Sequence, residues 1–194
     1  MEKIIKMILC FALAFLLIGC ETKSSESEIS DVTISEPNET DVSNAEAESI
    51  QEGICELYLE VLEDLWNVDS GLNNEISKIG VDLSKLSGLT KNEKDYVMSK
   101  FASKHNLPYV SGTWEELCEQ GYIDKENLIW EDGLFFSIKT NEDAIKADSK
   151  GLEYIPFDAQ KWRSGLGAYF FDQCLAQRGA DGKWSYTIGQ EAIS

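Results

Sequence analysis

Residues 161–167 are the most unusual stretch of an otherwise acidic chain, because two cations, a tryptophan, a hydroxyl group and two glycines occur together there. Lys161, Trp162 and Arg163 are followed there by a serine and two glycines. A tryptophan beside an arginine offers a stacking surface and a partner for carboxylates. The glycines precede an expected strand, so they favour a bulge or close backbone contact over a phosphate-binding loop. We predict that Lys161, Trp162 and Arg163, with Trp114, are candidate ligand or partner contacts, and the alternative is a structural role.

His105 and Cys118 are the residues most suited to nucleophilic catalysis. His105 is the only histidine, and a histidine can activate a cysteine thiol when the two are in contact. The alternative is that His105 lies at the end of a helix, where an imidazolium complements the helix dipole. One histidine without cysteine or carboxylate partners at ligand spacing indicates no zinc site.

Three carboxylates crowd one short predicted helix, at Glu115, Glu116 and Glu119. Paired carboxylates perform acid–base chemistry when their surroundings separate their pKa values. At a helix start they also favour the dipole, and no calcium-binding loop pattern accompanies them. We therefore interpret them as a solvated face, and we predict no catalytic residue, no metal and no cofactor.

The elements that must position these residues begin with helices. Capping-box patterns, which pair a side-chain cap with an acidic residue three positions later, mark three helix starts. The three pairs are Ser49 with Glu52, Thr90 with Glu93, and Thr113 with Glu116. An apolar stripe at helical spacing over residues 54–65 follows the first of them.

Strand patterns dominate after the second helix. Alternation at residues 79–83 and an extended piece at 109–110 surround that helix, which favours a single β-α-β crossover near 79–111. Asp132-Gly133 predicts a hairpin between residues 128–130 and 134–136, and Asp181-Gly182 predicts another turn. Further strands are expected near 152–155, 165–177 and 184–188. The predicted class is α+β, with N-terminal helices packed on a mostly antiparallel sheet.

The N-terminus is typical of an exported protein. Lys3 and Lys6 precede an apolar run over residues 7–18, which is too short to span a bilayer comfortably. The run ends in Leu17-Ile18-Gly19-Cys20, which resembles the lipobox of bacterial lipoproteins. This resemblance implies cleavage between Gly19 and Cys20, and a lipid on Cys20 that holds the protein at the outer face of the cell membrane.

The chain therefore divides into a signal peptide (1–19), a lipidated cysteine with a disordered acidic linker (20–49), and one globular domain (50–194). Residues 21–49 contain nine acidic residues and one lysine, and the signal peptide carries +1. From the total of −18, residues 50–194 keep −11. This charge excludes nucleic acid as a partner and opposes direct docking on anionic lipid.

Three cysteines remain in the domain, at Cys55, Cys118 and Cys174. Export permits a disulfide, but an odd number leaves at least one thiol. We expect buried thiols instead of a bridge, because cysteine behaves as a small apolar residue.

Two segments, at residues 113–127 and 161–169, together with the lipobox, resemble uncharacterised lipoproteins of low-GC Gram-positive bacteria. The resemblance implies a cell-surface location and no particular activity. The first expectation is a non-enzymatic module that binds an envelope protein, a peptide or a cell-wall ligand. The alternatives are a solute-binding lipoprotein associated with a transporter and an envelope hydrolase.

Overall fold

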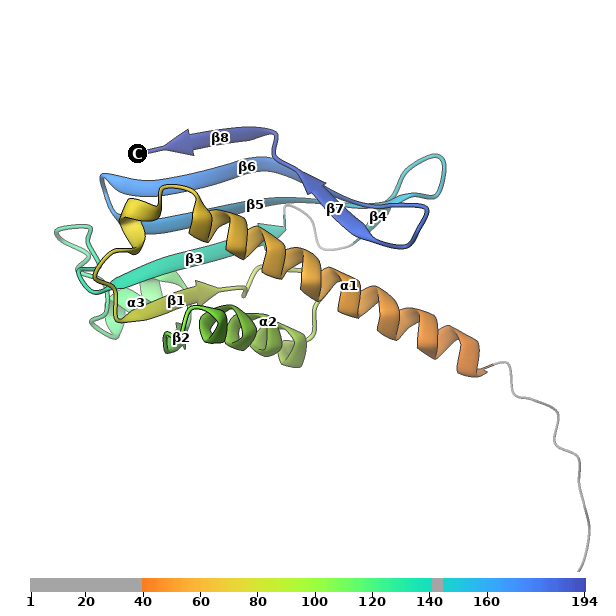
Figure 1. Cartoon of the computed structure of the whole chain (residues 1–194), viewed down its shortest axis with the longest axis horizontal. Helices are drawn as coiled ribbons and strands as arrows, with labels where there is room; N and C mark the ends of the chain where they lie inside the picture. The colour runs from red at the N-terminus through yellow and green to blue at the C-terminus, as the bar shows by residue number, and fades with distance from the viewer. Residues whose placement is uncertain (1–39, 141–144) are drawn as a thin grey trace, which may run out of the picture. The chain divides into compact units, whose positions relative to one another are not determined.

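The protein combines helices with one large sheet, as shown in Figure 1. The structure is a computed structural model that describes residues 40–140 and 145–194. The mixed helix and strand content predicted from the sequence is confirmed. The sheet order is β2-β1-β3-β5-β6-β7, with β4 beside β5 and β8 beside β6. The strands are β1 (Lys78–Asp82), β2 (Tyr109–Ser111), β3 (Gly133–Thr140), β4 (Lys146–Ala147), β5 (Glu153–Ser164), β6 (Gly167–Arg178), β7 (Trp184–Thr187) and β8 (Gln190–Ile193).

Parallel and antiparallel pairs occupy different parts of this sheet. Strand β1 runs parallel to both β2 and β3, and helix α2 (Lys91–Lys104) lies between β1 and β2 in the chain. This is the order that the sequence predicts for residues 79–111. All pairs from β3 onward are antiparallel. Short turns therefore connect β5 to β6 and β6 to β7, whereas the parallel strands need longer connections.

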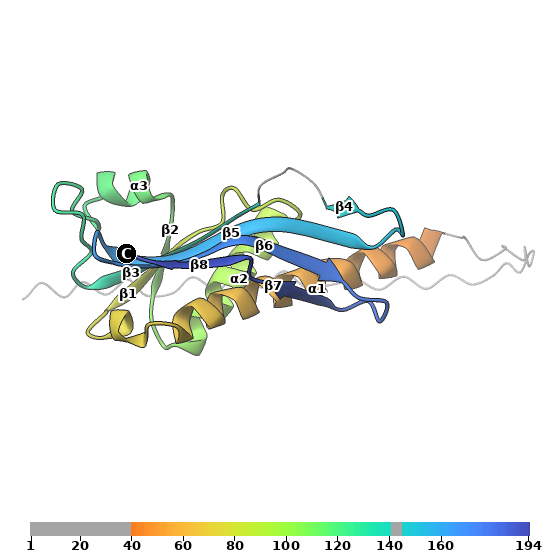
Figure 2. The same cartoon turned by 90° about the horizontal axis from the view of Figure 1, so that it is seen from above.

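Helices α1 (Thr40–Asn67) and α2 cover one face of the sheet, as Figures 1 and 2 show. The apolar stripe of α1 packs with α2 against the strands. The main core combines Leu57, Tyr58, Val61, Phe101, Phe136 and Phe157, all of them buried. Helix α2 starts at the predicted capping box of Thr90 and Glu93, which both exchange hydrogen bonds.

Helix α1 begins at Thr40, before the start that the Ser49 pattern predicts. Residues 45–48 are Ala-Glu-Ala-Glu, and both residue types are strong helix formers. Helix propensity therefore continues through Ser49, and the predicted linker overlaps the first turns of α1. The remainder of that linker, the signal peptide and Cys20 lie outside the described residues.

Helix α3 (Trp114–Glu119) lies on the opposite face of the sheet (Figure 2). The predicted capping box of Thr113 and Glu116 starts it. A second, smaller core forms beneath it from Leu117, Ile123, Trp130 and Phe135. The domain is thus layered on both faces at this end of the sheet.

The predicted hairpin around Asp132-Gly133 is wrong. Residues 128–130 form no strand, and β3 begins at Gly133 and pairs in parallel with β1. The indole of Trp130 instead folds onto this position, because a Cβ on Gly133 would lie 1.9 Å from its Cε2 atom. Packing of a large buried ring has therefore overridden a local turn signal.

Among the described residues, no helix has the length and apolar character needed to cross a membrane.

Candidate functional site

The face of the sheet opposite α1 and α2 carries the candidate site. The central strands β3, β5 and β6 run through this part of the sheet, between α3 at one end and β4 at the other (Figure 2). Successive side chains of a strand point to opposite faces, so the even-numbered residues of β5 face this side. They include Asp158, Gln160 and Trp162, all half-buried.

Cross-strand pairing places polar and aromatic side chains beside one another here. Gln160 lies opposite Ser137 on β3 and opposite Phe170 on β6. Lys139 lies opposite Asp158 in the next row. Directly opposed residues of antiparallel strands have Cβ atoms about 5 Å apart, which allows one ligand to contact all three strands.

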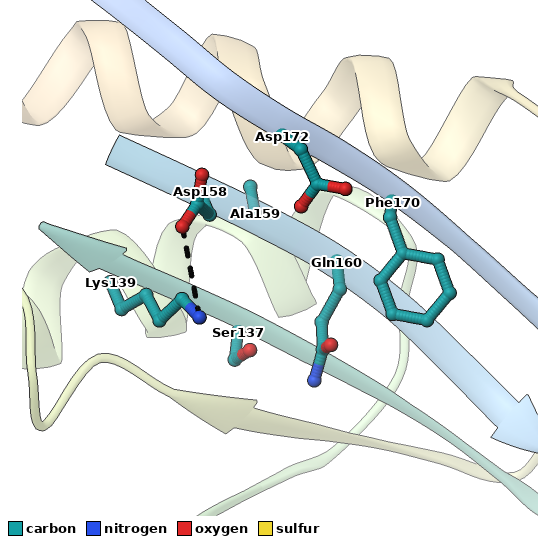
Figure 3. A pocket seen from close by; sticks show the side chains of 7 residues that line it. All are labelled: Ser137, Lys139, Asp158, Ala159, Gln160, Phe170 and Asp172. Atoms are coloured by element: carbon teal, nitrogen blue, oxygen red, sulfur yellow. Dashed lines mark ion pairs between the residues drawn. The ribbon is translucent and has the colours of Figure 1, made fainter. Parts of the chain in front are cut away.

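A hollow of about 220 Å³ lies over these rows (Figure 3). We call it the open-face hollow. It is lined by Ser137, Lys139, Asp158, Ala159, Gln160, Phe170 and Asp172. Mixed polar and aromatic lining of this kind is typical of small-ligand sites, where a few polar groups fix the orientation of the ligand.

A β-bulge shapes the floor of the open-face hollow. The register of β5 and β6 shifts between Phe157 and Ala159, and Gln173 on the bulged strand has a left-handed φ of 54°. The main-chain N–H of Gln173 donates to the Asp158 carboxylate at 2.9 Å. Bulges redirect side chains and occur often beside functional sites. This one fixes Asp158 in place.

The two carboxylates of the hollow differ in their partners. Asp158 accepts from Gln173 and forms an ion pair with Lys139 at 3.7 Å. The side chain of Asp172 makes no hydrogen bond or ion pair with any other described residue, and Figure 3 shows its carboxylate directed over β5. The hollow therefore retains one negative charge that no other described residue pairs.

The predicted contact residues Trp114 and Trp162 meet at the α3 end of the same face. Their rings form an edge-to-face pair with centroids 6.0 Å apart. Both are half-buried and pack against the smaller core under α3. Trp162 follows Gln160 on the same side of β5, so this pair lies next to the open-face hollow, although neither ring lines it.

Lys161 and Arg163 point to the other face of the sheet, away from Trp162. Lys161 is fully buried and donates to the main-chain carbonyls of Trp66, Val68 and Asp69 at the end of α1. Burial lowers its pKa to about 8, and the Asp69 charge opposes that shift. The cation thus caps the helix C-terminus, where carbonyl groups have no intrahelical partner.

Arg163 holds the adjacent segment in a similar way. Its guanidinium donates to the carbonyls of Leu72 at 2.9 Å, Asn74 at 2.5 Å and Glu131 at 2.7 Å. The register of β5 and β6 shifts between Trp162 and Ser164, at Arg163, whereas the two glycines expected to mark a bulge lie in the following turn and at the start of β6. The four predicted contacts therefore do not form one surface, and only Trp114 and Trp162 lie beside the hollow.

His105 and Cys118 lie on opposite faces of the sheet, so the structure does not bring them together as a dyad. His105 is the C-cap residue of α2, stacks on Trp66 with centroids 3.7 Å apart, and contacts Glu63 at 3.2 Å. Cys118 lies in α3. Burial raises the pKa of its thiol, which disfavours the nucleophilic thiolate.

The other candidates also have structural roles. Glu116 completes the capping box of α3, and Glu115 and Glu119 are exposed. Cys118 and Cys174 are free thiols, while Cys55 and Cys174 are buried in the main core. In the parts of the chain described, no three histidine, cysteine or acidic side chains gather as a metal site.

Sequence reasoning missed the open-face hollow. Its residues come from three strands, and β5 was expected only near residues 152–155. The available signal was the alternation of residues 157–162, in which Phe157, Ala159 and Lys161 alternate with Asp158, Gln160 and Trp162. Comparison with known protein families, with curated proteins and with solved structures finds no match for this chain.

Proposed function

We propose that the protein is an extracytoplasmic lipoprotein that binds a ligand on the open face of its sheet and performs no chemistry on it. In this proposal a lipid on Cys20 anchors the chain after cleavage at Gly19. The acidic segment that follows leads to a domain of the α+β class, with helices on one face of a mostly antiparallel sheet. The partners are the membrane, through the lipid, and an envelope protein, peptide or cell-wall ligand.

One observation carries the binding role. The helices α1 and α2 cover one face of the sheet, whereas the other face holds the open-face hollow beside the Trp114–Trp162 pair. A half-buried aromatic ring, an amide and a carboxylate that no other described residue pairs line this hollow from neighbouring strands. No observation in the described residues specifically favours the solute-binding or hydrolase alternatives.

The anchor is tested by mass spectrometry of the protein isolated from its own cells. We expect a chain that begins at Cys20 and carries acyl groups. Cys20→Ala should abolish both the modification and membrane retention, whereas the matched variant Cys10→Ala, within the signal peptide, should keep both. An unmodified Cys20 in the native protein contradicts the proposed anchor.

The binding face is tested by photo-crosslinking in intact cells. A photoreactive residue replaces Gln160 in the open-face hollow, and a control replaces Glu56, which is exposed on α1. We expect a discrete adduct from position 160 that is absent from position 56. Equal labelling at the two positions, or no adduct at position 160, would remove the open face as the binding surface.

A further inference from the structure

The open-face hollow has the groups needed to recognise a cation. Asp172 contributes a carboxylate that no other described residue pairs. Gln160 contributes an amide oxygen, and Ser137 contributes a hydroxyl group. A primary ammonium group has three hydrogen-bond donors and no acceptor. The three side chains therefore supply as many acceptors as one ammonium group requires.

Phe170 adds an aromatic surface beside Asp172. The two residues are on the same strand and both line the hollow, and Phe170 lies opposite Gln160 (Figure 3). The face of an aromatic ring attracts a cation within about 6 Å of its centroid. The same ring provides apolar contact for an alkyl chain that carries the cation.

The electrostatics of the domain favour the same kind of ligand. Residues 50–194 carry a net charge of −11, which attracts cations over long range. Within the hollow, Lys139 is paired with Asp158, so its charge is largely balanced locally. Asp172 then remains as the site for an external positive charge.

We propose that the open-face hollow binds a primary ammonium group on an alkyl chain, presented as the lysine side chain of a peptide. The inference rests on the proposed function and specifies its ligand. The ammonium group contacts Asp172, Gln160 and Ser137, and its alkyl chain lies against Phe170. Trp162 and Trp114, which lie next to the hollow, contact the peptide beyond the side chain.

A matched pair of small probes tests this assignment. The first is Nα-acetyl-lysine-N-methylamide, and the second is the same compound acetylated at Nε, which removes only the charge. Binding to the full chain in detergent is followed through backbone amide shifts. We expect saturable shifts at residues of the open-face hollow with the charged probe, and affinity at least ~5-fold weaker with the acetylated one.

Three substitutions complete the test. Asp172→Asn keeps the shape and removes the charge, and should weaken binding of the charged probe by at least ~5-fold. Glu56→Gln makes the same charge change on the other face and should alter it less than ~2-fold. An unchanged thermal melt shows that each variant folds, and Phe170→Leu should weaken binding independently of Asp172.

Failure of this inference can be distinguished from failure of the proposed function. Equal affinity for the two probes, shifts on another surface, or wild-type affinity of Asp172→Asn overturns the ammonium assignment. A position-160 adduct in cells would still support the open face as a binding surface. Absence of that adduct, in contrast, contradicts the proposed function itself.

Discussion

Lys161→Met tests the account of how the helical layer is attached to the sheet. Lys161 is fully buried and donates to three carbonyl groups at the end of α1 and to the side chain of Asn73. Methionine keeps much of the apolar stem but removes every donor. The substitution therefore leaves the carbonyls of Trp66, Val68 and Asp69 without this partner.

The expected loss follows from two opposing contributions. Hydrogen bonds to a charged group contribute about 1.5–3 kcal/mol each, and buried acceptors that lose their partner are costly. Removing the buried charge offsets part of this loss of stability, because the desolvation cost of the charge disappears. We expect Lys161→Met to lower the free energy of unfolding by about 2 kcal/mol near pH 7.

The pH dependence gives a sharper test. The pKa of Lys161 is lowered from 10.5 to about 8 in the folded protein. Between these values the unfolded chain binds the proton and the folded protein does not, so stability rises with pH. The wild type should therefore gain about 2 kcal/mol over Lys161→Met between pH ~8 and pH ~9.5. This contribution is lost as the pH falls through 8.

Chemical denaturation of both proteins across this pH range measures the difference. Lys139→Met is the matched control, because the Lys139 side chain is 57% exposed and forms only a surface ion pair. It should change stability by less than about 0.5 kcal/mol. The opposite result is a difference in the free energy of unfolding between wild type and Lys161→Met that narrows as the pH rises. It would mean that the carbonyl groups stabilise the charged form of Lys161 more than burial disfavours it, and the reasoning is then refuted.

Three further substitutions probe other parts of the fold. Gly133→Ala should lower the free energy of unfolding by more than about 3 kcal/mol, measured by denaturation, because its Cβ would meet the Trp130 ring at 1.9 Å. Thr113→Ala should cost about 1 kcal/mol by removing the cap of α3, measured in the same way. Burial lowers the pKa of His105 in the folded protein, although Glu63 opposes this shift. The stability of the protein should therefore fall as the pH drops from 6.5 through the folded-state pKa of His105. His105→Gln should flatten this pH dependence in melting curves.

Each of these has a control and a contradicting result. Gly71→Ala would place its Cβ 3.6 Å from Asp69, an ordinary contact, and a cost equal to that of Gly133→Ala would show that the Trp130 ring is not the cause. Thr113→Ser retains the capping oxygen, so a loss matching that of alanine would reject the cap. For His105, an unchanged pH profile in the glutamine variant would assign the dependence to other groups.

Local signals in the sequence predicted local structure correctly. The capping boxes at Thr90 and Thr113 form as expected, because their partners lie three residues away. The hairpin at Asp132-Gly133 is wrong, because β3 pairs with β1, more than 50 positions earlier in the chain. Trp130 covers both Gly80 and Gly133, and the sequence shows no such contact between distant residues.

The stretch around Lys161 shows the same limit at the candidate site. Lys161 and Arg163 were expected beside Trp162 on one surface, but alternation along β5 separates them to opposite faces. Most of their acceptors lie between Trp66 and Asn74, about 90 positions away in the sequence. The sequence alone does not show which residues accept hydrogen bonds from these cations. It therefore does not distinguish a structural cation from one that binds a ligand.

Strand β5 therefore connects the stability of the domain with its proposed binding role. Its odd-numbered positions hold α1 through Lys161 and fill the core with Phe157, whereas its even-numbered positions face the open side. The attachment of α1 holds the covered face of β5 in place. Because Asp158 and Gln160 lie on the same strand, this attachment also fixes their spacing on the open face. The open-face hollow is thus preorganised by contacts on the side of the sheet that a ligand does not reach.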